Sequence, residues 1–224
     1  MPEIIGLMPM GGNGTRLGMP FPKPLAPTIT RSGIVPLYRH SLSELLKVTV
    51  RVFAIVNRGT DGCLLRSLES YGVTPIYIEA PTLSGALGEA GMGFSVRFGE
   101  DTLIATVLPD AIWQCGKGRS LVDVVAAVKE DGALALFQAG SDETDSVFTN
   151  GDRVVRVETK SGLEGGLVVG WGAFVVRAGA LETLTGEEKD GPQLGRLRMG
   201  WAFLGSYVDL GTPERYIKWH DRRS

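Results

Sequence analysis

The sequence predicts an α/β fold with a doubly wound, mostly parallel sheet and helices on both faces. Two observations support this prediction. Short runs of aliphatic and β-branched residues alternate with segments of helical periodicity along the 224 residues, and such alternation is typical of βαβ units. The run 102–108 is almost continuously apolar, as expected of a strand that is buried on both faces.

The elements follow from periodicity and from local signals. Apolar residues at helical spacing predict helices, although four glycines weaken the prediction of a helix at 83–96. Pro36 and Pro213 suit the first turns of the predicted helices that begin near them. Asn150-Gly151 supplies the turn of a predicted hairpin over 147–158. The expected strands are 4–8, 50–57, 73–78, 102–108, 133–138, 167–176 and 202–210. The expected helices are 36–48, 61–70, 83–96, 121–129 and 213–222.

Composition argues against several classes of protein. Apolar residues make up 43% of the chain, and the formal net charge of −2 is unlike that of a nucleic-acid-coating surface. Cys63 and Cys115 are far apart and show no metal spacing, which favours a reducing compartment. No signal peptide and no membrane-spanning apolar run is recognised. We therefore expect a cytoplasmic protein without nucleic-acid or membrane partners.

A glycine-rich stretch follows the first expected strand. It runs Gly11-Gly12-Asn13-Gly14-Thr15-Arg16-Leu17-Gly18. Glycines allow positive φ and a close approach of backbone N–H groups to an anion. Arg16 adds a fork of donors that suits phosphate, and Lys23, between two prolines, adds a point charge. Neither the P-loop nor the dinucleotide pattern fits this stretch, so it predicts a longer phosphate-binding loop.

Gly-Gly-Asn-Gly-Thr-Arg-Leu followed by Pro-Lys-Pro-Leu resembles the signature of the nucleoside-diphosphate-sugar pyrophosphorylases, the sugar-1-phosphate nucleotidyltransferases. The resemblance implies a Rossmann-like, glycosyltransferase-A-like nucleotidyltransferase fold. Residues 1–224 then form one domain, with a nucleotide-binding half at 1–140 and a sugar-phosphate-binding half at 141–224. The implied reaction transfers a nucleotidyl group from a nucleoside triphosphate to a sugar 1-phosphate and releases pyrophosphate. Mg²⁺ is the implied cofactor, and a homo-oligomeric state is left open.

The resemblance also implies roles for residues of the loop. Arg16 is expected to hold the β- and γ-phosphates, and Lys23 is expected to lie nearer the α-phosphate and the transition state. Both are candidate catalytic residues. The expected nucleotide contacts in the loop are Met10, Gly11, Gly12, Gly14 and Thr15.

Two aspartates are candidate Mg²⁺ ligands. Asp110 follows a buried strand, where the family places a metal aspartate. Asp209 begins Asp-Leu-Gly-Thr-Pro-Glu-Arg-Tyr, which is similar to the family's closing motif. An alternative for this second segment is the start of a helix that Thr212 caps. Both interpretations can hold together, because Thr212 can cap the helix while Asp209 binds the metal. Mg²⁺ takes few carboxylates along with phosphate oxygens and waters.

Two further segments resemble substrate-binding parts of the family. Thr82 to Leu87 resembles the base-reading segment, with Ser84 and Gly85 as nucleotide contacts; a helix start capped by Thr82 or Ser84 is an equal alternative. Val157-Glu158-Thr159-Lys160 resembles the segment that binds the sugar phosphate. Lys160 is then expected to hold the phosphate, Glu158 a sugar hydroxyl, and Gly172 to back the sugar. An ordinary surface lysine is the alternative for Lys160.

Other functions are weighed beside this one. The short gap from Arg16 to Lys23 is closer to that of N-acetylglucosamine-1-phosphate uridylyltransferases and isoprenoid cytidylyltransferases. A cytidylyltransferase acting on a polyol, choline or isoprenoid phosphate is therefore an alternative. A non-catalytic nucleotide-sensing paralogue is disfavoured, because Arg16, Lys23, Asp110 and Asp209 are all present. Glycosyl transfer expects a closely spaced Asp-x-Asp, which 142–145 does not provide.

Overall fold

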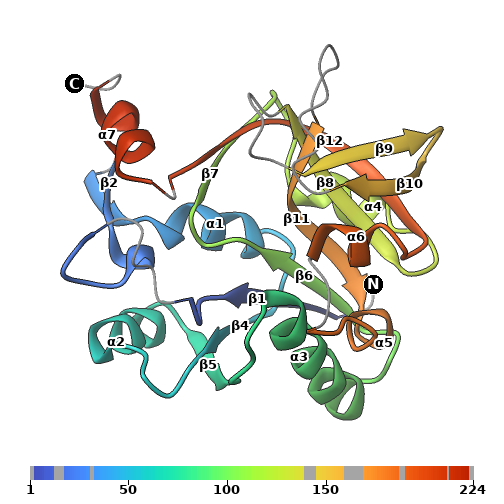
Figure 1. Ribbon diagram of the computed structural model, residues 1–224, viewed down its shortest axis with the longest axis horizontal. Helices are drawn as coiled ribbons and strands as arrows, with labels where there is room; N and C mark the ends of the chain where they lie inside the picture. The colour runs from blue at the N-terminus through green and yellow to red at the C-terminus, as the bar shows by residue number, and fades with distance from the viewer. Residues whose placement is uncertain are drawn as a thin grey trace.

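The computed structural model describes residues 3–12, 18–30, 33–138, 145–158, 169–186, 190–210 and 212–221. One large twisted sheet has helices on both faces (Figure 1), so the predicted α/β fold class is confirmed. The strands are β1 (Ile4–Pro9), β2 (Pro27–Thr30), β3 (Gly33–Pro36), β4 (Arg51–Val56), β5 (Val73–Tyr77), β6 (Leu103–Val107), β7 (Ala111–Cys115), β8 (Gly132–Gln138), β9 (Ser146–Asn150), β10 (Arg153–Glu158), β11 (Val169–Arg177) and β12 (Met199–Asp209). The helices are η2, a 3-10 turn (Lys23–Leu25), α1 (Tyr38–Leu45), α2 (Gly62–Ser70), α3 (Leu83–Phe98), α4 (Leu121–Ala126), α5 (Ala178–Leu181), α6 (Asp190–Leu194) and α7 (Pro213–Asp221).

The N-terminal half of the chain builds four parallel strands in the order β5-β4-β1-β6. β1 lies inside this group, and its Leu7 is paired with Phe53 on β4 and Thr106 on β6. Every residue of β6 is buried, which confirms the strand covered on both faces. Because parallel strands point the same way, the loops after β1, β4, β5 and β6 emerge side by side at one edge.

The C-terminal half continues the sheet in a mixed arrangement. β11 runs antiparallel to β6 and β8, and β12 runs parallel to β8. The β9–β10 hairpin pairs with β12, lies at the far edge, and turns at Gly151 and Asp152, as Asn150-Gly151 predicted. This half therefore extends the same sheet, and no separate sheet is needed for it.

β12 changes partner along its length, from β8 to β7. The change occurs at Gly205, which is paired with Phe137 on β8 and with Cys115 on β7. Its φ is +136°, and an added Cβ would lie 2.4 Å from the carbonyl oxygen of Gln114. Glycine is required at this bulge, and the bulge directs the end of β12 toward the N-terminal half.

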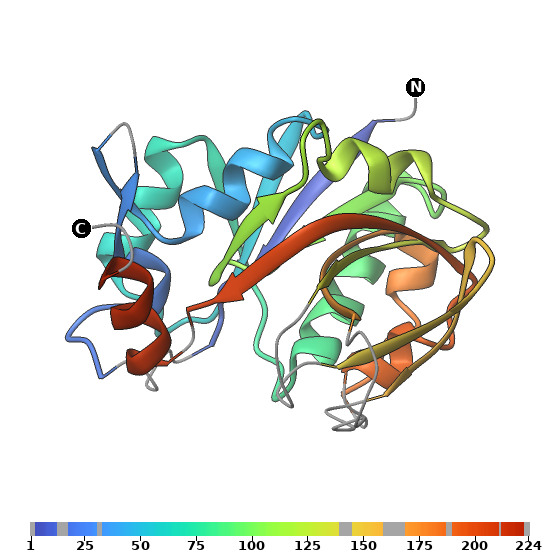
Figure 2. The same ribbon diagram turned by 90° about the horizontal axis from the view of Figure 1, so that it is seen from above.

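The two faces of the sheet carry separate cores, and Figure 2 shows helices on either side of the strands. Leu42 of α1, Leu64 of α2 and Val124 of α4 belong to one core. Leu87 of α3 and Leu181 of α5 belong to the other. Helices thus cover both faces, as a doubly wound sheet requires. No helix in the described residues is long and apolar enough to cross a membrane.

The last helix packs against the β2–β3 hairpin (Figures 1 and 2). Trp219 lies in a small core with Ala26 and Leu210. The Tyr216 hydroxyl donates a hydrogen bond to the Pro27 carbonyl oxygen. α7 therefore braces the segment that directly follows Lys23.

Some elements were not predicted, namely β2, β3, β7, α5, α6 and the η2 turn. The β2–β3 hairpin was not predicted, because proline counts against a strand. Pro27 and Pro36 are paired at the open end of the hairpin, where a missing N–H is tolerated. Pro36 is the last residue of β3, and α1 begins at Tyr38. The prediction that Pro36 lies in the first turn of a helix was therefore wrong.

Candidate active site

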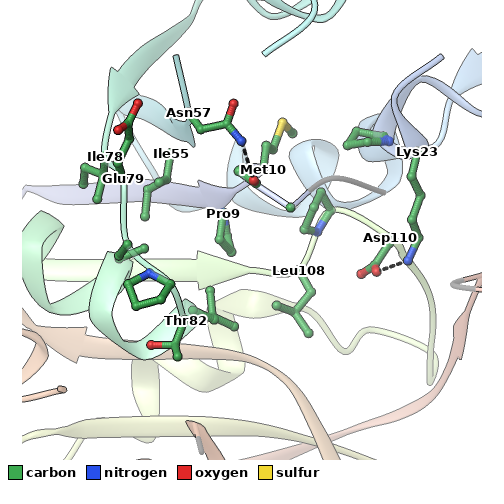
Figure 3. Close-up of a pocket in the computed structure, with 18 residues that line it drawn as sticks. Pro9, Met10, Lys23, Ile55, Asn57, Ile78, Glu79, Thr82, Leu108 and Asp110 are labelled. Carbon is green, nitrogen blue, oxygen red and sulfur yellow. Dashed lines mark hydrogen bonds and ion pairs between the residues drawn. The ribbon is translucent and has the colours of Figure 1, made fainter. Parts of the chain in front are cut away.

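A cavity of about 900 Å³ opens at the carboxyl edge of the parallel strands (Figure 3). Its walls come from the segments after β1, β4, β5 and β6, from η2 and from the first turn of α3. Most of the lining residues are apolar, and only a few polar side chains reach the wall. Such a cavity at this edge is the expected ligand site of an open α/β sheet.

Lys23 and Asp110 form an ion pair at one end of the cavity, as Figure 3 shows. Lys23 lies in the single turn of η2, between Pro22 and Pro24, and its side chain is only 8% exposed. The Asp110 side chain is 27% exposed. A buried ammonium needs such a partner, so the pair fixes a positive group and a carboxylate at the cavity wall.

Asp209 lies beside this pair, although 99 positions separate it from Asp110 in the sequence. It ends β12, where it is paired with Ala111 of β7, and the Leu210 N–H donates to the Asp110 carbonyl oxygen at 3.0 Å. The Asp209 carboxylate accepts a 2.9 Å contact from Nη1 of Arg215, on the first turn of α7. The fold therefore brings the two predicted metal ligands to neighbouring backbone positions.

The donor set of this edge fits a hard cation such as Mg²⁺. Mg²⁺ is commonly held by one or two carboxylates together with substrate phosphate oxygens and water. Among the described residues no group of three His, Cys, Asp or Glu side chains could hold a metal. Asp110 and Asp209 are the residues that would hold the ion.

Negative charge gathers around the side chain of Tyr207, on β12. Burial raises the pKa of Tyr207, and the carboxylates of Asp209, Asp110 and Asp145 raise it further. Its hydroxyl stays protonated near neutral pH. Two of these carboxylates already form ion pairs, Asp110 with Lys23 and Asp209 with Arg215.

Part of the glycine-rich loop lines the cavity. Met10, Gly11 and Gly12 all contribute to the wall, and Asn57 Nδ2 donates to the Gly11 carbonyl oxygen at 2.8 Å. Gly11 and Gly12, at the start of the loop, do not have positive φ, whereas Gly18 has φ +62°. Positive φ therefore does not explain Gly11 and Gly12. The expected contacts Gly14, Thr15 and Arg16 lie outside the described residues.

Ser84 and Gly85 do not line the cavity. The Ser84 side chain is fully buried, and the Gly85 N–H donates to Thr82 Oγ1 at 3.1 Å. This is the capped helix start that the sequence offered as an alternative. The wall at this place is formed by the segment just before it, from Ile78 to Leu83, together with Ala86.

The residues expected to bind the acceptor are only partly grouped. An added Cβ at Gly172 would lie 3.4 Å from the Phe137 ring and 3.9 Å from the Tyr207 ring, so this glycine packs against two aromatic side chains and does not line the cavity. Glu158 ends the hairpin strand β10 and forms a 3.1 Å ion pair with Arg156; it does not line the cavity. Lys160 lies outside the described residues.

Two polar residues of the cavity were missed from the sequence, Asn57 and Glu79. Both lie just beyond the carboxyl end of a parallel strand, β4 and β5 respectively, and that position was the available signal. Figure 3 places them away from the Lys23–Asp110 pair. Glu79 forms a loose 3.7 Å pair with Arg58.

Comparison with known proteins adds structural neighbours. No protein-family model matches the sequence, and no curated protein matches it. Solved structures of sugar-phosphate nucleotidyltransferases do resemble the chain. A UDP-glucose pyrophosphorylase from Acinetobacter baumannii has a TM-score of 0.70 at 16% identity, covering 98% of this chain and 92% of its own.

Two other neighbours cover the chain equally well. The inositol-1-phosphate CTP transferase from T. maritima has a TM-score of 0.69 at 17% identity, covering 98% of this chain and 95% of its own. A nucleoside-diphosphate-sugar pyrophosphorylase from Vibrio cholerae has a TM-score of 0.67 at 15% identity, covering 96% and 98%. At these identities the likeness establishes the fold, which is that of the nucleotidyltransferases.

Proposed function

We propose that this protein transfers a nucleotidyl group from a nucleoside triphosphate to a sugar 1-phosphate, giving a nucleoside-diphosphate sugar and pyrophosphate. One observation carries the proposal. The buried Lys23–Asp110 pair stands at the end of a nucleotide-sized cavity and directly beside Asp209. The nucleotidyltransferase fold of the neighbours supports the same reaction class.

The proposed chemistry needs charge neutralisation more than a strong base. An oxygen of the acceptor phosphate forms a bond to the α-phosphorus of the triphosphate. The bond from that phosphorus to the α,β-bridging oxygen breaks, and pyrophosphate leaves with the electron pair. Lys23 is placed to offset charge on the reacting phosphate oxygens, and the loop backbone at Met10 to Gly12 is placed to orient the triphosphate.

Mg²⁺ is the proposed cofactor, held by Asp110 and Asp209. When bound, it supplies positive charge to the phosphate oxygens and helps to align the reactants. We also propose a cytoplasmic location, which the free thiols of Cys63 and Cys115 support.

A second candidate is transfer of a cytidylyl group to a non-sugar phosphate such as a polyol phosphate. The likeness to an inositol-1-phosphate CTP transferase favours it. The two candidates share the same chemistry and differ in the nucleobase and in the acceptor.

A substrate panel tests the proposal. The purified protein is incubated with each of ATP, CTP, GTP, UTP and dTTP, and with sugar 1-phosphates or polyol phosphates, with and without Mg²⁺. Pyrophosphate release and the mass of the product are measured. We expect one nucleotide and one acceptor class to give Mg²⁺-dependent product. Triphosphate hydrolysis without product, or no turnover on a wide panel, would contradict the proposal.

A further inference from the structure

Two cation–carboxylate pairs stand side by side at the proposed site. Lys23 pairs with Asp110, and Arg215 pairs with Asp209 through a 2.9 Å contact from Nη1. The hydrogen bond from the Leu210 N–H to the Asp110 carbonyl oxygen holds the two aspartates on adjacent chain segments. Each predicted metal ligand therefore has its own cation.

The two pairs differ in their relation to the cavity. Lys23 and Asp110 line it, whereas Asp209, Arg215 and the rest of β12 and α7 do not. Arg215 thus lies next to the reacting centre but outside the space assigned to the nucleotide. Its side chain is 31% exposed, so a ligand can reach it from solvent.

In this proposal the acceptor phosphate approaches from that outer side, because the cavity itself is assigned to the nucleotide. The phosphate is a dianion near neutral pH, and on this path it meets the negative charges of Asp110 and Asp209. A cation is needed to offset this charge. A guanidinium presents parallel N–H donors that match two phosphate oxygens, so it suits a phosphate monoester better than a point charge does.

Resting on the function proposed above, we propose that Arg215 binds the phosphate group of the acceptor. In the structure Arg215 contacts the Asp209 carboxylate. A divalent cation that binds Asp209 competes with Arg215 for this carboxylate and weakens its contact with the guanidinium, which can then turn toward the incoming phosphate. α7, which Tyr216 and Trp219 anchor to the β2 side of the molecule, carries Arg215 to this place.

Kinetics of Arg215→Ala, Arg215→Lys and the control Lys218→Ala test the proposal. Lys218 is exposed one turn further along α7. With the nucleotide and acceptor that the panel identifies, Arg215→Ala should raise the KM for the acceptor at least tenfold and change the KM for the nucleotide less than about twofold. Arg215→Lys should recover part of the loss, and Lys218→Ala should match the wild type.

Metal binding without nucleotide gives an independent readout. Mn²⁺ is titrated into each protein and the free ion is followed by electron paramagnetic resonance. Arg215→Ala should bind Mn²⁺ several-fold more tightly than the wild type, because the competing cation is gone, and Lys218→Ala should not. Melting curves check that every variant is folded.

Several results would overturn the inference. One is an unchanged acceptor KM in Arg215→Ala; another is an equal rise in the nucleotide KM, which would assign Arg215 to the triphosphate. Unchanged or weaker Mn²⁺ binding would exclude the competition. Because this titration needs no turnover, unchanged Mn²⁺ binding overturns the competition at Asp209 even if the wild type proves inactive on the whole panel, a result that contradicts the proposed function.

Discussion

The Lys23 ammonium lies at a position where burying a positive charge is energetically costly. Its side chain is nearly buried, and the Asp110 carboxylate compensates its charge. We expect Lys23→Ala to lower kcat by roughly 10²-fold or more, the scale seen when one preorganised charge-stabilising group is lost. The KM for the triphosphate should change much less. Steady-state kinetics measures both, with the exposed Lys117 replaced by Ala as the matched control. Wild-type turnover in Lys23→Ala would remove this lysine from the mechanism.

The neighbouring aspartates allow a sharper test of the metal proposal. Asp110→Asn and Asp209→Asn each keep the side chain's size and withdraw one negative charge from a hard cation's ligands. Each should abolish most activity, and the double variant should lose little more activity than either one. Asp110→Asn should also be less stable than the wild type, because it leaves the nearly buried Lys23 ammonium without its carboxylate. Pyrophosphate release is measured across a Mg²⁺ titration, with melting curves beside it. Normal activity and normal Mg²⁺ dependence in Asp209→Asn would show that this residue is only structural.

How much of the site can be predicted from sequence depends on the kind of contact. Lys23 and Asp110 could be singled out because each carries a local signal, a Pro-Lys-Pro segment and a residue after a buried strand. The contact of Asp209 with Arg215 could not, because it depends on how α7 docks. For Ser84 the sequence left two interpretations open, because a capped helix start and a base-binding segment favour the same residue types. The Mg²⁺ role of the aspartates stays a prediction.

At the scale of elements, α3 shows why glycine content is a poor guide to whether a segment is helical. Gly88 and Gly91 face the segment at and after α5 so closely that an added Cβ would lie 2.2 Å from the Leu184 carbonyl oxygen and 2.5 Å from the Glu182 nitrogen. These glycines lower the intrinsic helix propensity, but they allow the helix to pack closely. The tertiary contact thus requires residues that local reasoning counts against the helix.

Alanine substitutions in α3 should therefore have opposite effects. Gly88→Ala and Gly91→Ala should each destabilise the protein by about 1–3 kcal/mol, because backbone atoms must move. An added Cβ at Gly93 would meet no atom within 4 Å, so Gly93→Ala should stabilise by about 0.5–1 kcal/mol through helix propensity. Urea unfolding measures all three. Equal effects at the three positions would contradict the packing argument.

Elements were predictable where periodicity and length agreed. β1, β4, β6 and α2 lie close to their expected ranges. β7 was not predicted, because it follows Pro109-Asp110 directly and is only five residues long. It exists because the end of β12 supplies a partner, and that partner is distant in the sequence.

At the scale of the whole molecule, Asp131 ties the starts of β8 and β12 together. The Arg198 N–H donates to its carboxylate at 2.8 Å, and the Arg198 guanidinium adds a 3.2 Å contact. Burial raises the pKa of Asp131, but these hydrogen bonds and the positive charge outweigh burial, so the pKa lies below its usual value. The resulting stabilisation is present above the unfolded-state pKa of about 3.9 and is lost as pH falls through the lower folded-state pKa.

Asp131→Asn should therefore be less stable than the wild type at pH 7, and the gap should shrink below about pH 4. Urea unfolding from pH 7 to the lowest pH at which the wild type still folds cooperatively measures the gap. Asp101→Asn serves as the control, because that side chain is 95% exposed and its pair with Arg177 contributes little. A gap that stays constant over this range would contradict the linkage.

The course of β12 has a consequence for synthesis. The cavity is lined by residues between Pro9 and Asp110, whereas Asp209 and Arg215 arrive only when β12 crosses back toward the N-terminal half (Figure 2). All the residues that line the cavity are therefore translated before Asp209, which follows Asp110 by 99 positions. The site proposed above is complete only when the end of the chain has been made.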